Sequence, residues 1–311
     1  MTKILCLTNY PEEYRKKLQE VKDVEIVFAA RNDDVSAHYD AEVIFGNLPV
    51  RKLSEFRNLK WIQLDSAGAD QYCNIDDSII LTNSSGAYGI AISEYMIGMI
   101  LMTMKKFDQY LKQQEDAVYR DLGHISTIYG STVLCLGTGD IGSNFARRIK
   151  ALGAHVIGLS RNEHTKPEWL DEAYTIDRLD ELLPKADIIA LSLPQTEKTR
   201  HILNGNNLPL CKNGSIIVNV GRGSAIDTEA LISECNKHHF KAVCLDVQET
   251  EPLDQNDPLW HTESVYVTPH IAGRQNANVT IGKIFSIMFN NLNHYLNNEP
   301  LDHVVDKKNR Y

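Results

Sequence analysis

The sequence lacks the features of a membrane protein or a nucleic-acid-binding protein. Its 311 residues contain no uninterrupted apolar run long enough to span a bilayer. Met1 to Leu7 opens directly into a strand pattern, without the basic and then apolar regions of a signal peptide. The 32 basic and 41 acidic side chains give a net charge of −9, and no block of like charge stands out. We therefore expect no nucleic-acid or membrane-surface binding.

The sequence also lacks the cysteine spacing of a metal or redox site. None of its six cysteines forms a C-x-x-C pair. Cys6, Cys135 and Cys244 lie inside apolar, strand-like runs. We expect reduced thiols in the core of a cytoplasmic protein, and we predict no bound metal.

Strand and helix patterns alternate along the chain, which is typical of parallel sheets with crossover helices. In the first third, strands are predicted over residues 4–7, 24–28, 43–45, 61–64 and 79–81, with a helix over 12–21. Later strands are predicted over residues 132–136, 155–159, 188–191, 215–220, 242–247 and 265–267. Two long helices are predicted over 91–118 and 274–296.

A glycine motif follows the predicted strand at 132–136 and opens a helical stretch. Its six residues are Gly137, Thr138, Gly139, Asp140, Ile141 and Gly142. The strand, G-x-G-x-x-G, helix and second strand fit within about 30 residues, which is the context of a dinucleotide-binding unit. The glycines allow a tight turn and a close approach to a pyrophosphate, which would sit on the helix N-terminus.

The end of the second strand indicates which dinucleotide binds. In an NAD site a carboxylate there bonds the ribose 2′-hydroxyl, whereas this chain has Ser160 and Arg161. A hydroxyl and a guanidinium suit a 2′-phosphate, so NADP(H) is favoured and NAD(H) is the alternative. Arg161 could equally be a solvated surface charge beside Glu163, and Lys166 could either join this site or face solvent.

The motif also suggests how the domains are arranged. Because it begins far into the chain, we predict a substrate domain of residues 1–98 and 274–311 and a dinucleotide-binding domain of residues 99–273. The predicted fold class is α/β, with two doubly wound parallel-sheet lobes. The cofactor domain would be of the Rossmann type and the substrate domain flavodoxin-like, with a cleft between them.

Three chemically capable side chains follow predicted strands of the second half, at the sheet edge where ligands bind. Arg222 lies between two glycines, and its planar fork can hold a carboxylate and reach a neighbouring carbonyl oxygen. Glu251 and His270 follow the next two strands. A glutamate beside a histidine holds one tautomer and favours the protonated ring of a general acid. Asp246 could accept from a nicotinamide carboxamide or brace that ring.

Each of these residues has a structural alternative. A single histidine among 11 is more often a surface or structural residue than a catalyst. Arg222 alone could be an ion-pair residue, and Glu251 a charge at a helix start. Their order behind a dinucleotide motif makes those alternatives weaker.

Taken together, the motifs resemble those of the D-isomer-specific 2-hydroxyacid dehydrogenases over nearly the whole chain. The matching segments are 66–70 (SAGAD), 92–94 (ISE), the glycine motif, 193–200 (LPQTEKTR), 219–223 (NVGRG), 246–252 (DVQETEP), 258–260 (PLW) and 268–273 (TPHIAG). The resemblance implies hydride transfer between nicotinamide C4 and C2 of a 2-keto acid. It implies that Arg222 orients the substrate, that His270 donates the proton and that Glu251 pairs with His270.

The same resemblance assigns binding residues. Backbone N–H groups of Ala67, Gly68 and Ala69 would hold the substrate carboxylate, and Asn47 and Leu48 would line the pocket. The cofactor site would be completed by Pro194, Thr199, Val220 and Asp246. A glutamate at position 251 disfavours the formate-oxidising relatives. The chain departs from the family pattern in having Ala69 where valine is common, and Tyr119 and Tyr129 where a tryptophan is frequent.

The function that we predict is NADPH-dependent reduction of a 2-keto acid to the D-2-hydroxy acid by a cytoplasmic homodimer. A glyoxylate or hydroxypyruvate reductase would use the same residues on smaller substrates. A protein of another class, which senses NADP(H) without turnover, would keep the cofactor motif and act through a partner.

Overall fold

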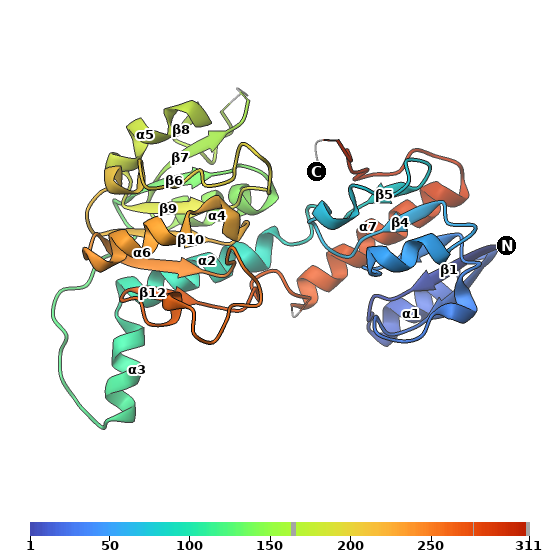
Figure 1. Ribbon diagram of the computed structural model, residues 1–311, viewed down its shortest axis with the longest axis horizontal. Coiled ribbons are helices and arrows are strands. Elements are labelled where there is room, and N and C mark those ends of the chain that lie inside the picture. Colours follow the sequence, from blue (N-terminus) through green and yellow to red (C-terminus); the bar gives the residue numbers. More distant parts are fainter. Residues whose placement is uncertain (163–165, 276, 309–311) are drawn as a thin grey trace. The chain divides into compact units, whose positions relative to one another are not determined.

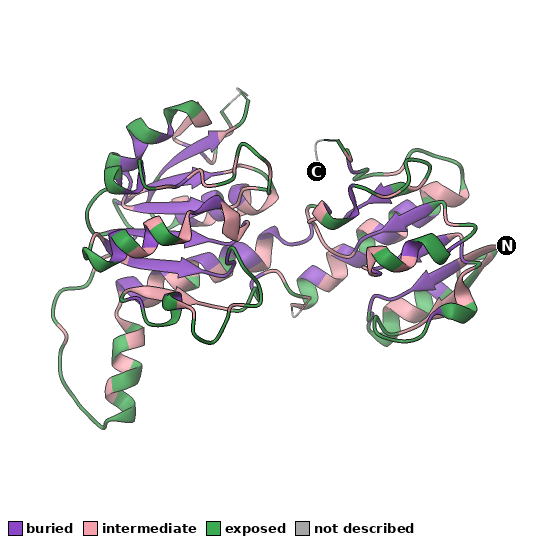
Figure 2. Ribbon diagram, viewed as in Figure 1, coloured by how far each residue is buried: buried purple, intermediate pink, exposed green. Residues whose placement is uncertain are grey.

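The chain forms two compact units in the computed structural model, which describes residues 1–162, 166–275 and 277–308. The first unit comprises Met1–Tyr88 and Gln275–Tyr311, and the second comprises Gly89–Arg274. Each unit is built around one parallel sheet (Figure 1). Both sheets place most of their strand residues in the interior, as the purple strands in Figure 2 show.

The first unit contains a five-stranded sheet in the order β2-β1-β3-β4-β5. Its strands are β1 (Thr2–Cys6), β2 (Val24–Phe28), β3 (Val43–Phe45), β4 (Trp61–Gln63) and β5 (Ile80–Thr82). Its helices are α1 (Glu12–Gln19) and α7 (Asn278–Leu296), with 3-10 turns at Ser36–His38, Val50–Glu55 and Asp70–Tyr72. Because all strand pairs are parallel, the loops that follow β1, β3 and β4 leave the same edge.

The second unit contains a seven-stranded parallel sheet in the order β12-β11-β10-β9-β6-β7-β8. Its strands are β6 (Thr132–Leu136), β7 (His155–Ser160), β8 (Glu172–Thr175), β9 (Ile188–Leu191), β10 (Ser215–Asn219), β11 (Phe240–Leu245) and β12 (Val265–Val267). Its helices are α2 (Gly89–Met104), α3 (Phe107–Glu115), α4 (Asp140–Ala151), α5 (Leu179–Leu182) and α6 (Thr228–Asn236). Its 3-10 turns are Ile176–Arg178, Leu183–Lys185, Leu208–Leu210, Gly223–Ala225 and Pro258–Trp260.

The strand order of this sheet reverses beside its first strand. The chain runs outward from β6 to β7 and β8, then returns to pair β9 with the other side of β6. This doubly wound order creates a switch point between β6 and β9, and ligands of such sheets bind at the carboxyl edge there. The predicted α/β class with two parallel-sheet lobes is confirmed.

Both predicted long helices are shorter than expected. The helix predicted over 91–118 is broken between α2 and α3, because Lys106 adopts a left-handed backbone with φ 59°. The lysine side chains at the break donate hydrogen bonds to carbonyl oxygens of the returning segment, at Leu122 and Ser126. The final helix begins at Asn278 instead of residue 274. Arg274 instead closes a turn by donating its N–H to the Ile271 oxygen at 3.2 Å.

The core of each unit is made mainly of aliphatic strand residues. Cys6, Cys135 and Cys244 lie in β1, β6 and β11 and are buried, and burial raises the pKa of each of these thiols to about 12. They therefore stay protonated at neutral pH, as core thiols do. None of the helices that the structure describes is both long and apolar enough to cross a membrane.

Candidate active site

The glycine motif forms the turn between β6 and α4 at the switch point. Gly137 has φ 98°, a backbone conformation that side chains disfavour. A Cβ atom at Gly142 would lie 1.9 Å from the Gly137 carbonyl oxygen, so only glycine permits this close packing. Within the described chain, the backbone N–H groups of Gly139, Asp140 and Ile141 have no protein acceptor. These donors at a helix N-terminus fit the pyrophosphate of a dinucleotide.

The side chain of Asp140 has a structural partner. Its Oδ2 accepts the N–H of Gly89 at 2.8 Å, and its Oδ1 accepts the Asn144 side-chain amide at 3.0 Å. The carboxylate therefore holds the start of α2 against the start of α4. Asp140 can therefore offer a cofactor its backbone N–H, whereas its carboxylate is already bonded to Gly89 and Asn144.

Ser160 and Arg161 lie at the carboxyl end of β7, where the sequence analysis placed the 2′-phosphate site. The Ser160 hydroxyl donates to the Asn162 oxygen at 2.8 Å, and Arg161 is exposed. The Lys166 ammonium group donates a hydrogen bond to the Leu170 oxygen at 3.0 Å. Glu163, the residue that could neutralise Arg161, lies outside the described residues.

The loop that follows β9 lies against the glycine motif, and the loop that follows β10 lies against the β9 loop. The Thr199 hydroxyl donates to the Pro194 oxygen at 2.6 Å and fixes the turn after β9. Val220 is buried directly after β10. These loops leave the carboxyl edge of β9, which pairs with β6, and of β10, which pairs with β9, and this edge is the position predicted for cofactor contacts.

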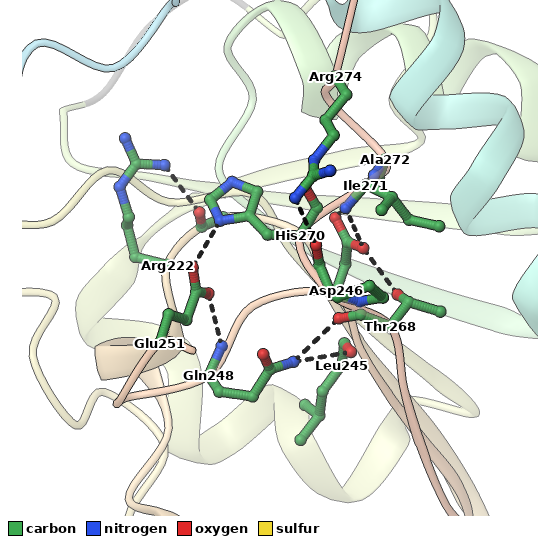
Figure 3. Close-up of polar contacts among 12 residues, drawn as sticks. Arg222, Leu245, Asp246, Gln248, Glu251, Thr268, His270, Ile271, Ala272 and Arg274 are labelled. Atoms are coloured by element: carbon green, nitrogen blue, oxygen red, sulfur yellow. Dashed lines mark hydrogen bonds and ion pairs between the residues drawn. The ribbon is translucent and has the colours of Figure 1, made fainter. Parts of the chain in front are cut away.

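His270 and Glu251 form a hydrogen-bonded pair at this edge. The distance from His270 Nδ1 to Glu251 Oε2 is 2.8 Å, and the two side chains are 47% and 33% exposed. Glu251 Oε1 accepts the backbone N–H of Gln248 at 3.0 Å, so the carboxylate is held from both sides (Figure 3). The imidazole is thus oriented by a fixed carboxylate while it stays half exposed to solvent.

Asp246 supports the loop that carries His270. It is 2% exposed and accepts three hydrogen bonds: from the Thr268 hydroxyl at 2.7 Å and from the N–H groups of Ile271 and Ala272, both at 2.9 Å. Tyr95, which lies in α2, shares a hydrogen bond with the Thr268 hydroxyl through its own hydroxyl group. Burial raises the pKa of Tyr95 to about 12, so this phenol stays neutral. These contacts brace the backbone of the loop, and the two roles considered from the sequence, accepting from a nicotinamide carboxamide and bracing the His270 ring, stay predictions.

Arg222 extends from the loop after β10. Its Nη1 donates to the Gly221 oxygen at 2.9 Å, and the Asn219 side-chain amide donates to its carbonyl oxygen at 3.0 Å. A Cβ atom at Gly223 would lie 1.9 Å from the Gln248 carbonyl carbon, so this glycine lets the Arg222 loop pack on the loop of Glu251. In Figure 3 the guanidinium and the His270 ring project to the same side of these loops.

Gln248 is a supporting residue for which the sequence analysis proposed no role. Its side-chain amide donates to the Leu245 oxygen at 3.1 Å and to the Thr268 oxygen at 3.3 Å, which joins the loops after β11 and β12. Its position in the sequence, between Asp246 and Glu251 and directly after the strand predicted over 242–247, could have indicated this supporting role.

The predicted substrate loop lies in the first unit, after β4. The Ser66 hydroxyl donates to the Gly68 oxygen at 2.7 Å, and the Asn47 side-chain amide donates to Ser66 at 3.0 Å. Leu48 is buried, and its carbonyl oxygen accepts the Tyr72 hydroxyl at 2.7 Å.

Three backbone donors of this loop remain available. Among the residues that the structure describes, no protein acceptor pairs with the N–H groups of Ala67, Gly68 or Ala69. We refer to residues 66–69 as the carboxylate loop. Its consecutive N–H groups can hold an anion in the way that backbone nests do.

The doubly wound sheet, the glycine motif and the supported histidine together define a dinucleotide-dependent oxidoreductase. Residues 97–272 match the family description "D-isomer specific 2-hydroxyacid dehydrogenase, NAD binding domain". The chain belongs to the D-isomer-specific 2-hydroxyacid dehydrogenase family, and it is an enzyme of the NAD(P)-dependent oxidoreductase class.

Individual relatives agree with this assignment. The chain is 32% identical to the D-3-phosphoglycerate dehydrogenase of Methanocaldococcus jannaschii, over 99% of this chain and 60% of that protein. It is 29% identical to the glyoxylate reductase of Aeropyrum pernix, over 84% of this chain and 77% of that one. A solved structure of a D-isomer-specific 2-hydroxyacid dehydrogenase family protein from Aeromonas salmonicida is 29% identical, with a TM-score of 0.90 over 98% of this chain and 99% of that chain.

Proposed function

We propose that this enzyme reduces a 2-keto acid to the D-2-hydroxy acid with NADPH, with His270 as the proton donor. The observation that carries the proposal is the His270–Glu251 pair, 2.8 Å apart, at the same sheet edge as the glycine motif. A reduction of a keto group needs a hydride and a proton. The cofactor supplies the hydride, and the half-exposed imidazole can supply the proton.

The remaining residues would bind and orient the substrate. Arg222 offers a fixed positive charge for the substrate carboxylate and for the charge that develops on the keto oxygen. The N–H groups of the carboxylate loop would bind the same carboxylate, and Asn47 would hold this loop in shape. Glu251 would keep the imidazole in one tautomer and stabilise its protonated form.

The preference for NADPH rests on Ser160 and Arg161. Both lie at the end of β7, where a ribose-binding carboxylate would favour NAD(H). A guanidinium there can pair with a 2′-phosphate, whereas NADH offers it only a hydroxyl.

Substrate turnover tests the proposal. Purified enzyme is assayed with 2-keto acids from glyoxylate to phenylpyruvate, with NADPH and NADH in parallel, and the product is resolved on a chiral column. We expect NADPH oxidation with at least one keto acid and a D-2-hydroxy acid as product. An L-product, or a wild-type enzyme equally efficient with both cofactors, contradicts the corresponding part of the proposal.

Two alternatives give different results in the same assay. A glyoxylate or hydroxypyruvate reductase is favoured by the likeness to the Aeropyrum pernix glyoxylate reductase, and it would give its highest kcat/KM with the smallest keto acids. An NADP(H) sensor would bind NADPH without turning over any keto acid.

We also propose that the enzyme is a homodimer joined through α3 and the segment that follows it. The helix α3 has no buried residue, and a nine-residue helix is marginal in water by itself. Phe107, Leu111 and Tyr119 are 56%, 59% and 108% exposed on this arm. A second copy of the chain would cover them. Light scattering should give twice the monomer mass, and Leu111→Lys should yield monomers; a wild-type monomer would contradict this proposal.

A further inference from the structure

Asp65 is a carboxyl group placed directly before the carboxylate loop. It follows β4 and precedes Ser66, the first residue of the loop. The Asp65 N–H donates to Asn47 Oδ1 at 3.1 Å, so its backbone is part of the same hydrogen-bonded frame. An ionised Asp65 would repel a substrate carboxylate bound by the carboxylate loop, because like charges repel.

Asp65 is also bonded to both places where the chain passes between the two units. The Tyr88 hydroxyl donates to the Asp65 carbonyl oxygen, and Tyr88 is the last residue of the first unit before Gly89. The Gln275 amide hydrogen-bonds the Asp65 carboxyl group, and Gln275 is the first residue after Arg274. The Thr8 hydroxyl lies 3.4 Å from Asp65 Oδ2.

The surroundings of this carboxyl group are largely neutral. Burial raises the pKa of Asp65 above the ordinary carboxyl range, although the Gln275 amide, the Arg31 guanidinium and the Thr8 hydroxyl favour its ionised form. Burial also raises the pKa of Tyr10 and Tyr88 well above the usual value, and that of Tyr72 to about 12, so these phenols stay neutral. Among the residues that the structure describes, the titratable and charged groups that face Asp65 are Cys6, Tyr10, Arg31, Tyr72 and Tyr88.

We propose that Asp65 is a positioning residue that makes keto acid affinity depend on protonation: its neutral carboxyl group supports anion binding by the carboxylate loop, and its ionised form opposes it. This proposal rests on the assignment of residues 66–69 to the substrate carboxylate. Asp65 acts through the loop and through the charge that it places beside the loop. Arg31 is the only cation among the neighbours named above, and it is exposed, so solvent weakens its compensation of the Asp65 charge.

Binding of oxamate, an unreactive analogue of a 2-keto acid, tests the proposal without turnover. The dissociation constant is measured by calorimetry on the NADPH-saturated enzyme between about pH 5 and pH 8. The ratio of the wild-type to the Asp65→Asn dissociation constant should rise from about one to roughly tenfold as pH rises through the Asp65 pKa, because the ionised carboxyl group repels the bound anion. Protonation of His270 changes the affinity of both proteins alike and cancels in this ratio.

Two further variants complete the experiment. Asp40→Asn is the matched control, because Asp40 pairs with Lys3 before β3, at the opposite edge of the same sheet, and it should behave as the wild type. Thr8→Val removes a donor that favours the ionised form of Asp65, so the fall in affinity should move to higher pH. This variant keeps the test decisive if Asp65→Asn does not fold.

Each outcome decides the proposal. A ratio that stays near one across this interval, or a fall that does not move in Thr8→Val, overturns it. Absence of oxamate binding at every pH overturns it as well. If no keto acid is turned over but oxamate binds as expected, the reductase assignment fails while the role of Asp65 stands.

Discussion

Two histidine–glutamate pairs of the second unit have nearly the same nitrogen–oxygen distance but lie at opposite edges of its sheet. His270 and Glu251 are 2.8 Å apart at the carboxyl edge, and His155 and Glu172 are 2.7 Å apart at the starts of β7 and β8. Both histidines are 47% exposed. A paired and half-exposed histidine therefore does not by itself identify a proton donor.

The surroundings distinguish the two pairs. Glu251 is fixed by the Gln248 N–H, and the loop of His270 is fixed by Asp246. Glu172 instead accepts the Tyr174 hydroxyl at 2.6 Å, within its own strand, and no glycine motif lies at that edge. We infer that the carboxyl-edge pair serves the reaction and that the amino-edge pair serves the fold.

The largest effect is expected at the carboxyl edge. His270→Ala should lower kcat by roughly 10²- to 10⁴-fold, the usual contribution of general acid catalysis, while NADPH binding persists. The measurement is steady-state kinetics together with NADPH titration by fluorescence.

A third pair provides the matched control for this variant. His201 and Glu249 are 2.6 Å apart on loops of the same carboxyl edge, and we assign them no part in the reaction. His201→Ala should leave kcat unchanged. If His201→Ala and His270→Ala exchanged these results, the proton donor would have been assigned to the wrong pair.

An intermediate effect is expected at the end of β7, which the cofactor adenosine would occupy. Arg161→Ala should raise KM for NADPH by about 10- to 100-fold, the value of a charge-assisted contact, and leave KM for NADH nearly unchanged. Lys185→Ala removes an exposed cation elsewhere in the unit and should change neither constant. An equal rise of KM for NADPH and NADH in Arg161→Ala would show that this arginine does not bind the 2′-phosphate.

The smallest effect is expected at the amino edge. The Tyr174 hydroxyl and His155 hold the pKa of Glu172 below the ordinary carboxyl range. A carboxyl pKa lowered by folding stabilises the protein above the unfolded-state pKa, and this stabilisation is lost as pH falls through the lowered pKa. Glu172→Gln should therefore reduce the free energy of unfolding by about 0.5 kcal/mol or less at pH 7, because the group is largely solvated.

Urea unfolding at neutral and acid pH checks this value, with kcat measured on the same samples. The difference between Glu172→Gln and the wild type should vanish in acid, and kcat should stay unchanged. A loss of kcat in Glu172→Gln would remove the distinction between the two edges.

The sequence was most informative where local pattern and fold agree. Buried strands such as β6 and β9 were predicted with their observed bounds, because continuous apolar runs between turn residues mark strands that are covered on both faces. Arg222, Glu251 and His270 could be placed at one edge because the carboxyl ends of parallel strands meet there.

Tertiary contacts explain most of what the sequence did not reveal. Lys105 and Lys106 suit a helix, and their bonds to the returning segment accompany the break there. The strand β8 has no buried residue and so lacks an apolar run. The helix α6 was missed although Asp227 is a recognisable N-cap, which accepts the Ala230 N–H at 3.1 Å.

The opposing pH dependence of the two reaction directions tests the central claim most directly. Keto acid reduction consumes one proton and alcohol oxidation releases one, so the wild-type kcat at saturating substrate should fall with rising pH for reduction and rise for oxidation across the neutral range where imidazoles titrate. In His270→Ala both slopes should disappear, whereas in His155→Ala both should remain. Slopes that persist in His270→Ala would contradict the assignment of His270 as the proton donor.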